Sequence, residues 1–570
     1  MTSTGSVASR RQAMADRHPA WQSWTLHAYL DWTLADFADR PLVITDGEVL
    51  DYGSTVALSR QLASGLTARG IAAGDRVGLV MANDPMTVPL LFAIWRVGAV
   101  AVPINTLYRP DELAYAVREA GCAILVTMRS FGSRDFPAML DDVLPGWKDG
   151  TCADAPELKG GLVFDRNAPG SFVQELCQDA EAGEIDVPVA VDDLAVIMFT
   201  SGTTGSPKGV SITHDNLMRA AYAGAYHQAF QDGRRAVFSL PLYHGFGMVV
   251  GLLSGMVVGG AIVPLLKFDP HAILTAIGRH RATYLMGVPT MTIALLEQAE
   301  KGGSAGESYD FSSLTAIHSA AAPTPSWVWK KIQATFGCEE IITSYGQTEV
   351  TATVVCTSPG DTIEVVSETQ GRIVEAGVAG MPDQGGRIAE FKTIHPETGA
   401  DLPWGSPGEL CCRSPLNSKG YFRRPEATAE LFLPGGWVRM GDLGQFREDG
   451  NLFLTGRSKE LYKSRGELVS PKELEQLLTR HPEISQAFFI GMPDDRYGEC
   501  GCAWVVRAAG STISPETIGA FLAGQVAAYK LPRDVWFIED ENLPKTGTGK
   551  VQKARLRDMA LDLVRELSAD

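Results

Sequence analysis

Short apolar runs that alternate with helical patterns are the feature of this sequence that most limits its fold. Helical patterns at 51–70 and 85–100 are followed by apolar runs at 75–83 and 101–105. The same alternation returns from Ala195 to Ser344, and each run there ends at a polar or glycine-containing turn. Strands that alternate with helices predict mostly parallel sheets, with functional residues just beyond the strand ends.

Three other stretches break this rhythm. Residues ~130–190 are polar and rich in Gly, Asp and Pro, and we expect a long irregular excursion there. Short strands separated by turn signals predict a β-rich subdomain at 355–455. Beyond it, helices at 470–484 and 514–530 and the strands between them predict a compact α+β unit. We therefore predict an N-terminal domain over 1–457 and a C-terminal domain over 458–570, with the boundary at residues 457–459.

The composition is that of a globular protein of more than one domain. The chain has 570 residues, of which 45% are hydrophobic and 21% charged. Its formal net charge of −17 disfavours non-specific binding to nucleic acid or to an anionic membrane. Nine cysteines without a CxxC pair fit a reducing compartment better than a disulfide framework.

No targeting or membrane segment is evident from the sequence. The N-terminus has two adjacent arginines but no apolar stretch after them, so we do not expect a secretory signal there. The longest apolar stretch, 237–266, contains six glycines, two prolines and a histidine. A buried strand–loop–helix–strand passage explains it better than a membrane span. We expect a cytoplasmic protein without an integral membrane segment.

The strongest local signal is the turn at residues 200–208, which follows an apolar run. It holds two glycines, five Ser or Thr residues and Lys208. Glycines let a backbone approach a phosphate closely, hydroxyls and amides donate hydrogen bonds, and the lysine supplies charge. A flexible surface linker is the alternative. The turn is not a Walker A loop, because Lys208 is followed by Gly209 instead of Ser or Thr.

TSGTTGSPKG at 200–209 closely resembles the phosphate loop of adenylate-forming enzymes, which include acyl-CoA synthetases, firefly luciferases and peptide-synthetase adenylation domains. The resemblance continues in order at 241–248, 319–325, 344–351, 408–428, 437–444, 456–475 and 543–557, and it is closest to stand-alone acyl-CoA synthetases. It implies a large N-terminal domain of parallel α/β sheets with a β-rich subdomain, and a small mobile C-terminal α+β domain. It also implies ATP, Mg²⁺ and CoA as partners of the reaction.

The resemblance implies roles for residues around the nucleotide. The β- and γ-phosphates would be held by Thr200, Ser201, Gly202, Thr203, Thr204, Gly205 and Lys208. Mg²⁺ would be bound by Glu349 and approached by Thr200, and Thr348 would contact the α-phosphate. The adenine would lie between Tyr345 and Gly346 on one side and Ala321 and Ala322 on the other. Asp442 and Arg457 would contact the ribose, although Met440 stands where the family usually has threonine.

Further roles concern the C-terminal part. By resemblance, Lys550 bridges the carboxylate and the α-phosphate during adenylation, and Lys459 is the hinge about which the C-terminal domain rotates. Lys463 and Gly466 are candidates for the thioester step. Without the resemblance, the basic run around Lys550 would be read as a mobile tail.

The acyl group is expected in a pocket of small and apolar residues. His244 would gate the carboxylate site, and the pocket would be lined by Phe246, Gly247, Met248, Gly287, Ser319, Ala320 and Ser344. None of these is an acid that could pair with an ammonium group, so amino-acid activation is disfavoured. A fatty, aromatic or bulky polycyclic acid is expected.

Several functional alternatives stay open. The first hypothesis is an acyl-CoA synthetase, and the second is an adenylation enzyme that loads a carrier-protein phosphopantetheine. A non-catalytic nucleotide- or acyl-binding protein is disfavoured because Lys208, Glu349, Asp442, Arg457 and Lys550 are all present. A light-emitting oxygenase is a remote fourth reading. The sequence leaves the oligomeric state open, a homodimer included.

Overall fold

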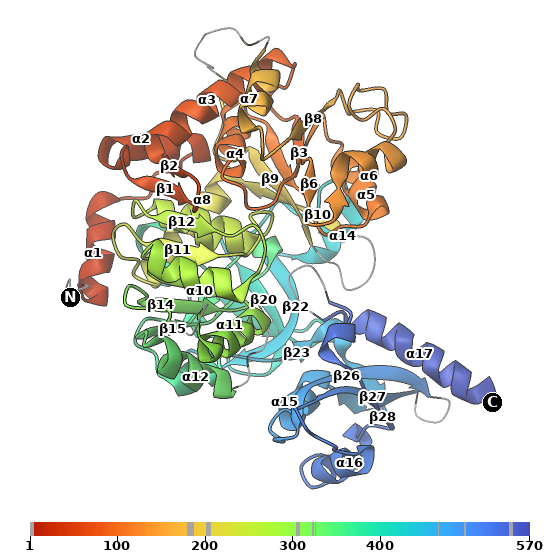
Figure 1. Cartoon of the computed structure of the whole chain (residues 1–570). Coiled ribbons are helices and arrows are strands. Elements are labelled where there is room, and N and C mark those ends of the chain that lie inside the picture. Colours follow the sequence, from red (N-terminus) through yellow and green to blue (C-terminus); the bar gives the residue numbers. More distant parts are fainter. Residues whose placement is uncertain are drawn as a thin grey trace. The chain divides into compact units, whose positions relative to one another are not determined.

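The structure is a computed structural model that describes residues 5–178, 180, 187–200, 207–303, 308–321, 324, 326–465, 467–494, 498–545 and 551–569. It divides into two compact units (Figure 1). Unit 1 comprises residues 1–200, 207–390 and 413–438, and unit 2 comprises 201–206, 391–412 and 439–570. In this division residues 439–457 go with the C-terminal residues. The domain boundary at residues 457–459 stays a prediction.

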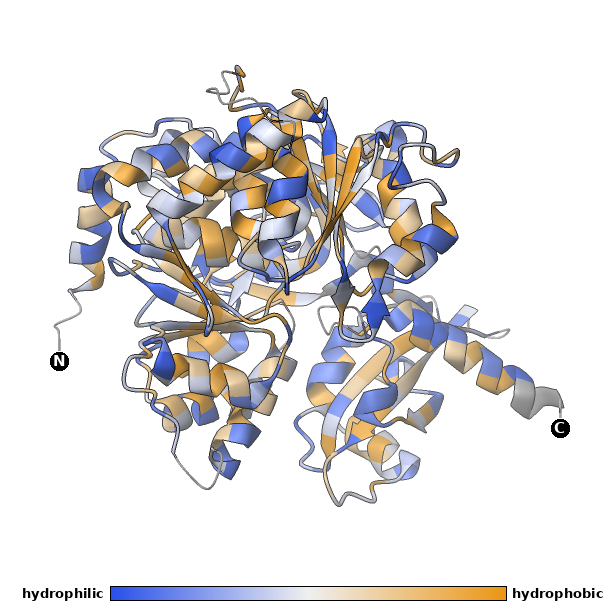
Figure 2. Ribbon diagram, turned by 45° about the horizontal axis from the view of Figure 1, so that its top comes forward, coloured by the Kyte–Doolittle hydropathy of each residue, from blue (hydrophilic) through white to orange (hydrophobic). Residues whose placement is uncertain are grey.

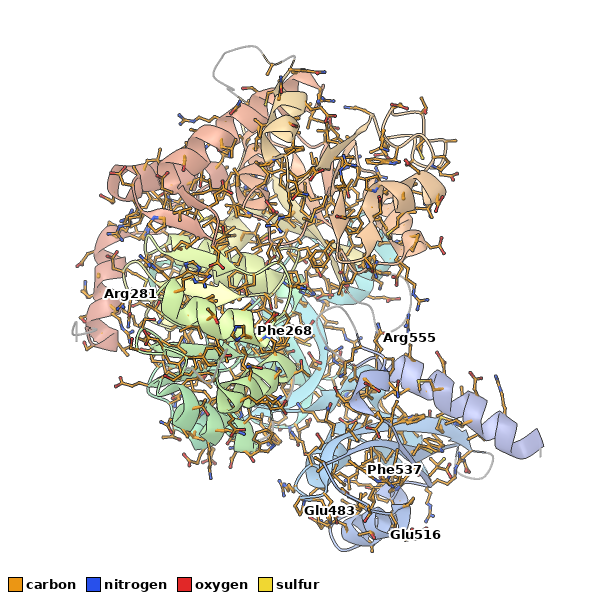
Figure 3. All side chains as sticks on the ribbon, in the orientation of Figure 1. Phe268, Arg281, Glu483, Glu516, Phe537 and Arg555 are labelled. Atoms are coloured by element: carbon orange, nitrogen blue, oxygen red, sulfur yellow. The ribbon has the colours of Figure 1, made fainter. Side chains whose placement is uncertain are left out.

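A seven-stranded sheet forms one half of unit 1, and its strands are parallel except at one edge. Its order is β15 (Glu340–Ile342), β14 (Ala316–Ser319), β13 (Tyr284–Gly287), β11 (Arg235–Phe238), β12 (Ala261–Pro264), β1 (Pro41–Ile44) and the antiparallel β2 (Val49–Asp51). Residues of α10 (Pro270–Arg279), α11 (Pro289–Lys301) and α12 (Ser326–Phe336) share one apolar core with these strands. Phe268, labelled in Figure 3, packs against that core.

A six-stranded sheet forms the other half of unit 1. Its order is β10 (Lys208–Thr213), β9 (Leu194–Thr200), β4 (Val100–Pro103), β3 (Arg76–Val80), β5 (Ile124–Met128) and β8 (Gly161–Phe164), with β10 alone antiparallel. All ten residues of α4 (Thr87–Arg96) are buried, and α3 (Tyr52–Ala68) packs on it. Figure 2 shows the strands of the sheets as largely hydrophobic. The predicted parallel α/β architecture is confirmed.

The expectation of an irregular excursion at ~130–190 is wrong for much of that stretch. The structure has β6 (Ser130–Phe131), β7 (Arg134–Asp135), α6 (Phe136–Val143), β8 and α7 (Pro169–Cys177) there. Asp135 caps α6 by accepting from the Ala138 amide, and β8 extends the sheet beside β5. Gly161 leaves room for Trp147, whose ring would lie 2.2 Å from an added Cβ. The elements are short, and polar turns hide them in the sequence.

The apolar stretch 237–266 is buried strand, loop, helix and strand, as predicted. After β11 the chain forms the π-helix η1 (Phe246–Leu253), then α9 (Ser254–Met256) and β12. The sequence did not indicate that this helix is of the π type. None of the helices that the structure describes has both the length and the apolar character needed to cross a membrane.

The described part of unit 1 contains further α-helices. They are α1 (Val7–Arg17), α2 (Leu26–Phe37), α5 (Pro110–Ala120), α8 (His214–His227), α13 (Ile363–Glu368) and α14 (Pro425–Leu431).

Short strands fill the region that was predicted to be β-rich. One sheet contains β16 (Ser344–Tyr345), β17 (Val355–Cys356) and β18 (Arg372–Ile373). A second contains β19 (Glu390–Ile394), β20 (Gly408–Arg413), β22 (Trp437–Phe446), β21 (Phe432–Leu433) and β23 (Leu452–Arg457).

The last ~110 residues form an α+β structure within unit 2. Its sheet contains β25 (Glu467–Val469), β24 (Tyr462–Ser464), β27 (Gly498–Arg507), β26 (Ile484–Asp494) and β28 (Asp534–Phe537). One core lies with α15 (Pro471–Leu478) and α16 (Pro515–Ala523), and another with α17 (Lys553–Ala569). The Arg507 guanidinium covers the ring of Phe537, labelled in Figure 3, at 3.5 Å. The helix expected at 514–530 ends at Ala523, and Gly524, a residue type that disfavours helix, follows it.

Candidate active site

The residues predicted to hold the acyl group lie beyond the carboxyl ends of neighbouring parallel strands of unit 1. Gly287 ends β13 and Ser319 ends β14, and the two are paired across the sheet. Ser344 follows β15, and His244 lies in the loop after β11. The amide of Ala320 donates to the Gly287 carbonyl at 3.3 Å. The topology therefore brings these residues to one edge of the sheet, where ligands of open α/β sheets bind.

The loop after β11 presents a neutral histidine next to the π-helix. Burial lowers the pKa of His244 to about 4, so its ring is uncharged at neutral pH. Its carbonyl accepts from the Met248 amide at 2.9 Å inside the first turn. A Cβ on Gly247 would lie 2.4 Å from the Pro241 carbonyl oxygen, so only glycine fits there. π-Helices occur frequently at functional sites, which makes this edge the candidate site on local geometry as well.

A buried polar chain lies behind the predicted acyl residues, and sequence reasoning missed it. His318, inside β14, contacts the Tyr284 hydroxyl through Nδ1 at 2.7 Å and the Ser344 hydroxyl through Nε2 at 2.8 Å. Its ring meets the ring of Phe246 edge-on at 4.9 Å. The available signal was a histidine in an otherwise apolar strand, directly before the predicted pocket residue Ser319.

Tyr421 contacts both a predicted phosphate-binding residue, Lys208, and the predicted metal ligand, Glu349. Thr200 and Lys208 face each other across β9 and β10, with Thr200 Oγ1 3.4 Å from the Lys208 carbonyl oxygen. Lys208 Nζ lies 4.7 Å from the centre of the Tyr421 ring, and the Tyr421 hydroxyl donates to Glu349 Oε1 at 2.8 Å. Sequence reasoning missed Tyr421, although it lies inside the matched motif at 408–428. Ser201, Gly202, Thr203, Thr204 and Gly205 lie outside the described residues.

Left-handed backbone conformations gather around the predicted adenine residues. Ala321, Thr351 and Ala352 have φ of 73°, 51° and 77°, a region that non-glycine residues rarely adopt. A Cβ on Gly346 would lie 1.5 Å from the Ala352 carbonyl oxygen, so that position requires glycine. Tyr345 is buried in β16. Thr348 begins the 3-10 turn η3 (Thr348–Val350), which carries Glu349. Ala322 lies outside the described residues.

The side chains of unit 1 fit a magnesium ion that is held mainly by its substrate. Among the described residues, no group of three or more His, Cys, Asp or Glu side chains could enclose a metal. Mg²⁺ usually binds through one or two carboxylates together with substrate phosphates and water. Glu349 supplies one carboxylate, and the bond from Tyr421 holds one of its oxygens in place.

In unit 2, the two predicted ribose residues form one pair. Asp442 in β22 and Arg457 at the end of β23 face each other, with Asp442 Oδ1 3.0 Å from Arg457 Nε. Asp442 is buried, and Ser458 Oγ donates to the Gly441 carbonyl at 3.0 Å. Met440 is also buried, so an apolar side chain fills the place of the usual threonine. A carboxylate in this position can accept hydrogen bonds from a vicinal diol.

The predicted hinge lies directly after this pair. Lys459 is in the 3-10 turn η6 (Ser458–Glu460), and Lys463 in β24 pairs with Glu397. The neighbouring Glu460 accepts from Lys553 Nζ at 2.6 Å. Gly466 and Lys550 lie outside the described residues, so their roles stay predictions.

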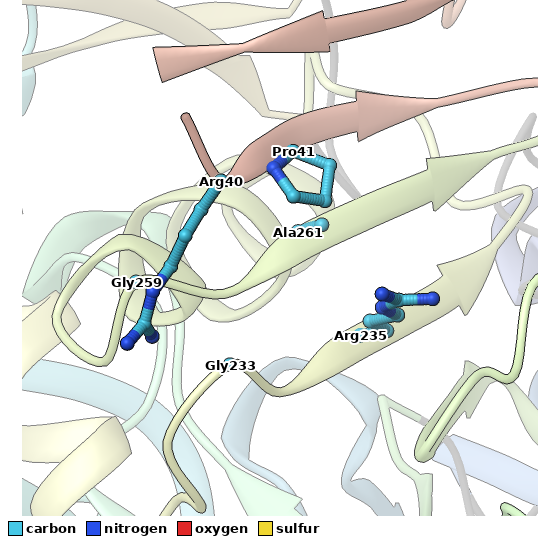
Figure 4. Close-up of a pocket in the computed structure, with 6 residues that line it drawn as sticks. All are labelled: Arg40, Pro41, Gly233, Arg235, Gly259 and Ala261. Carbon is cyan, nitrogen blue, oxygen red and sulfur yellow. The ribbon is translucent and has the colours of Figure 1, made fainter. Parts of the chain in front are cut away.

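A hollow of about 200 Å³ lies away from these residues (Figure 4). It occurs where β1, β11 and β12 begin, which is the opposite edge of the sheet from His244 and Ser344. It contains none of the predicted site residues and is lined by Arg40, Pro41, Gly233, Arg235, Gly259 and Ala261. Since ligands of such sheets bind at the carboxyl ends of strands, this hollow is not the candidate active site.

Comparison with known proteins agrees with the geometry. The family model "AMP-binding enzyme" matches residues 30–422, and "AMP-binding enzyme C-terminal domain" matches 473–550. The acyl-CoA ligase SID4 of Ajellomyces capsulatus is 33% identical over 96% of this chain and 93% of its own length. The medium-chain acyl-CoA ligase ACSF2 of Danio rerio is 31% identical over 95% and 89%. The crystal structure of ATP-bound MatB from Rhodopseudomonas palustris superimposes on this chain with a TM-score of 0.81. The two are 28% identical, and the match covers 94% of this chain and 99% of MatB.

Proposed function

Because the chain belongs to the AMP-binding enzyme family, whose matched relatives are acyl-CoA ligases, we propose that it activates a hydrophobic carboxylic acid with ATP and transfers the acyl group to CoA. In the first step the carboxylate attacks the α-phosphate, an acyl-adenylate forms and pyrophosphate leaves. In the second step the thiol sulfur of CoA attacks the acyl carbon, AMP leaves and the thiol proton passes to solvent.

The observation that supports the proposal most is the arrangement of Lys208, Tyr421 and Glu349. Both reactants of the first step are anions, so catalysis depends on positioning and on neutralising charge. Lys208 and the hydroxyls of the turn would hold the phosphates. Glu349, oriented by Tyr421, would hold Mg²⁺, which supplies charge neutralisation when bound.

Unit 2 would supply the remaining groups. Asp442 would accept from the ribose hydroxyls, and its pairing with Arg457 at 3.0 Å supports a carboxylate held in one orientation. Lys550 would approach the α-phosphate during the first step. Rotation about Lys459 would then withdraw Lys550 and bring Lys463 and Gly466 to the site for the thioester step.

The nature of the acid follows from the lack of charge around the predicted pocket. Burial lowers the pKa values of His244 and His318 to about 4 and about 3, so both rings are neutral. An ammonium group buried there would have no anionic partner among the predicted lining residues. The name of the ACSF2 relative, a medium-chain acyl-CoA ligase, supports an apolar acid, and both named relatives support CoA as the acceptor.

Pyrophosphate release over a panel of fatty, aromatic and polycyclic acids, with and without CoA, tests this proposal. We expect acid-dependent pyrophosphate release with ATP, and an acyl-CoA product by mass spectrometry when CoA is added. An acyl-adenylate that reacts with a phosphopantetheine carrier protein but not with CoA would favour the carrier-loading alternative. ATP binding without pyrophosphate release for every acid would indicate a non-catalytic binding protein.

A further inference from the structure

The buried polar chain behind the predicted acyl residues has a defined order. The Tyr284 hydroxyl donates to Gln228 Oε1 at 2.5 Å and contacts His318 Nδ1 at 2.7 Å. On its other side, His318 Nε2 lies 2.8 Å from Ser344 Oγ. Gln228, Tyr284 and His318 are at most 1% exposed, so water does not compete for these bonds.

The bond from the Tyr284 hydroxyl to Gln228 Oε1 sets the order of donors and acceptors along this chain. The single hydroxyl proton of Tyr284 goes to Gln228, so the Tyr284 oxygen must accept from His318 Nδ1–H. Burial lowers the pKa of His318 to about 3, so the ring is neutral and carries one N–H. His318 Nε2 is therefore an acceptor, and Ser344 donates its hydroxyl proton to it. The Ser344 oxygen is then left with lone pairs only.

A buried ion pair lies beside this chain. The Arg234 guanidinium lies 4.6 Å from the centre of the Tyr284 ring, its side chain is fully buried, and it pairs with Glu340 at 3.4 Å. Because the charge of Arg234 acts on the Tyr284 hydroxyl in either arrangement, the direction of hydrogen bonding rests on the bond from Tyr284 to Gln228 Oε1.

The end of the chain lies at the candidate site. Ser344 is 8% exposed and is followed directly by Tyr345, the predicted adenine residue. The His318 ring also contacts Phe246, with which the π-helix begins. A hydroxyl that can only accept is therefore placed among residues predicted to line the acyl pocket.

We propose that Ser344, oriented by His318, is a specificity-determining residue that accepts a hydrogen bond from a hydroxyl or N–H group on the acyl part of the substrate acid. This inference rests on the proposed function, and it narrows the substrate class to acids whose apolar body carries a hydrogen-bond donor. A site built around a hydrogen bond discriminates against the analogue that lacks the donor, because its own polar group is then left unpaired.

The test compares kcat/KM for pyrophosphate release with matched acids. Cinnamic acid, its three hydroxy isomers and its three methoxy isomers form one set, and octanoic acid with its 3-hydroxy and 8-hydroxy derivatives forms another. We expect the best hydroxy acid to exceed its parent by roughly tenfold, and the methoxy acids, which cannot donate, to show no such advantage. Ser344→Ala should remove the advantage by lowering kcat/KM for the hydroxy acid while the parent acid is still activated.

Two further variants keep the test decisive. Tyr284→Phe frees His318 to adopt either tautomer, so it should reduce the preference without deleting Ser344. Thr315→Val is the matched control, because Thr315 Oγ1 bonds the Thr283 carbonyl at 3.0 Å just before β14 begins, at its opposite end. This control should keep the preference.

The outcomes separate the two proposals. If hydroxy acids have no advantage in wild type, if methoxy acids share it, or if Ser344→Ala retains it, the specificity role is overturned while acid activation stands. If no acid of either set, and no acid of the fatty, aromatic and polycyclic panel, supports pyrophosphate release, the proposed function itself fails.

Discussion

The two units differ in how they bury polar groups. Near the candidate site of unit 1, Gln228, Tyr284, His318 and Ser344 are neutral and joined by hydrogen bonds, although the buried Arg234 beside them pairs with Glu340. Next to the predicted hinge of unit 2, the partly buried groups Lys553, Glu460 and Glu475 are ions. A neutral chain can present one lone pair to a ligand, whereas an ionic cluster ties separate elements together. The difference suggests that unit 1 selects the acid and that unit 2 governs conformation and charge.

The ionic cluster joins three elements of unit 2. Lys553 of α17 bonds Glu460 of η6 at 2.6 Å and Glu475 of α15 at 2.7 Å. Burial disfavours the charge of Lys553, but Glu475 and Glu460 outweigh it and raise the pKa of the lysine. Glu475 also accepts from the Phe489 amide at 2.7 Å. The segment directly after Lys459 is thereby fastened to the C-terminal helices.

The largest effect on activity should come from replacing Lys550, the lysine of unit 2 that is proposed to approach the α-phosphate. Lys550→Ala should lower acid-dependent pyrophosphate release by at least about 10²-fold, since a positioned charge at the reacting phosphate is lost. The preference among acids should not change, because unit 1 sets it. Thioester formation from supplied acyl-adenylate should be largely retained.

Lys545→Ala is the matched control for this change. Lys545 lies in the same segment and pairs on the surface with Asp540 at 2.7 Å. We expect near wild-type activity from it. If Lys550→Ala damaged both half-reactions equally, or altered the order of preferred acids, the division of labour between the units would be wrong.

The second effect concerns stability. Lys553→Met should destabilise unit 2 by about 1–3 kcal/mol, because Glu460 and Glu475 would lose their cation in a partly buried site. Hydrogen–deuterium exchange of the β26 amides measures this locally in the full chain. Arg565→Met, which removes an exposed pair with Asp562, should change exchange very little. Unchanged β26 protection in Lys553→Met would show that the cluster does not hold unit 2 together.

The parallel sheets and the order of the motifs could be predicted from the sequence, because alternating apolar runs and glycine-containing turns are local signals. Strand β8 was missed because its four residues lie between polar segments. The π-helix was missed because α and π patterns look alike in an apolar stretch. Both depend on packing that only the assembled fold supplies.

The candidate site also contains residues that the sequence could predict and contacts that it could not. Lys208 and Glu349 could be predicted because they lie in contiguous motifs, although their roles still await the experiments above. The contacts of His318 with Tyr284 and Ser344 could not be predicted, because three separate strands bring these residues together. The same holds for the bonds of Lys553, which join residues up to 93 positions apart.

The smallest expected effect is a pH dependence of the stability of unit 2 that comes from Lys472. Burial lowers the pKa of Lys472 to about 8, against about 10.4 in an unfolded chain. Below pH 8 the lysine is protonated in both states, so the folded state bears the full cost of burying its charge. Between pH 8 and about 10.4 only the unfolded state keeps the proton, so the cost falls and stability rises with pH. The charged neighbours are Asp442, Glu475, Lys553 and Glu460.

Replacing this lysine should therefore change stability only on the low-pH side. Lys472→Met should raise the free energy of unfolding by about 1 kcal/mol at pH 7, and this gain should vanish near pH 10. Lys472→Arg keeps a charge that does not titrate, so it should lack the recovery at high pH. Urea unfolding at pH 7 and pH 10, with the unit 2 transition assigned by exchange of β26 amides, measures both. If Lys472→Met raised the free energy of unfolding equally at pH 7 and pH 10, the gain would come from packing and not from removal of a buried charge.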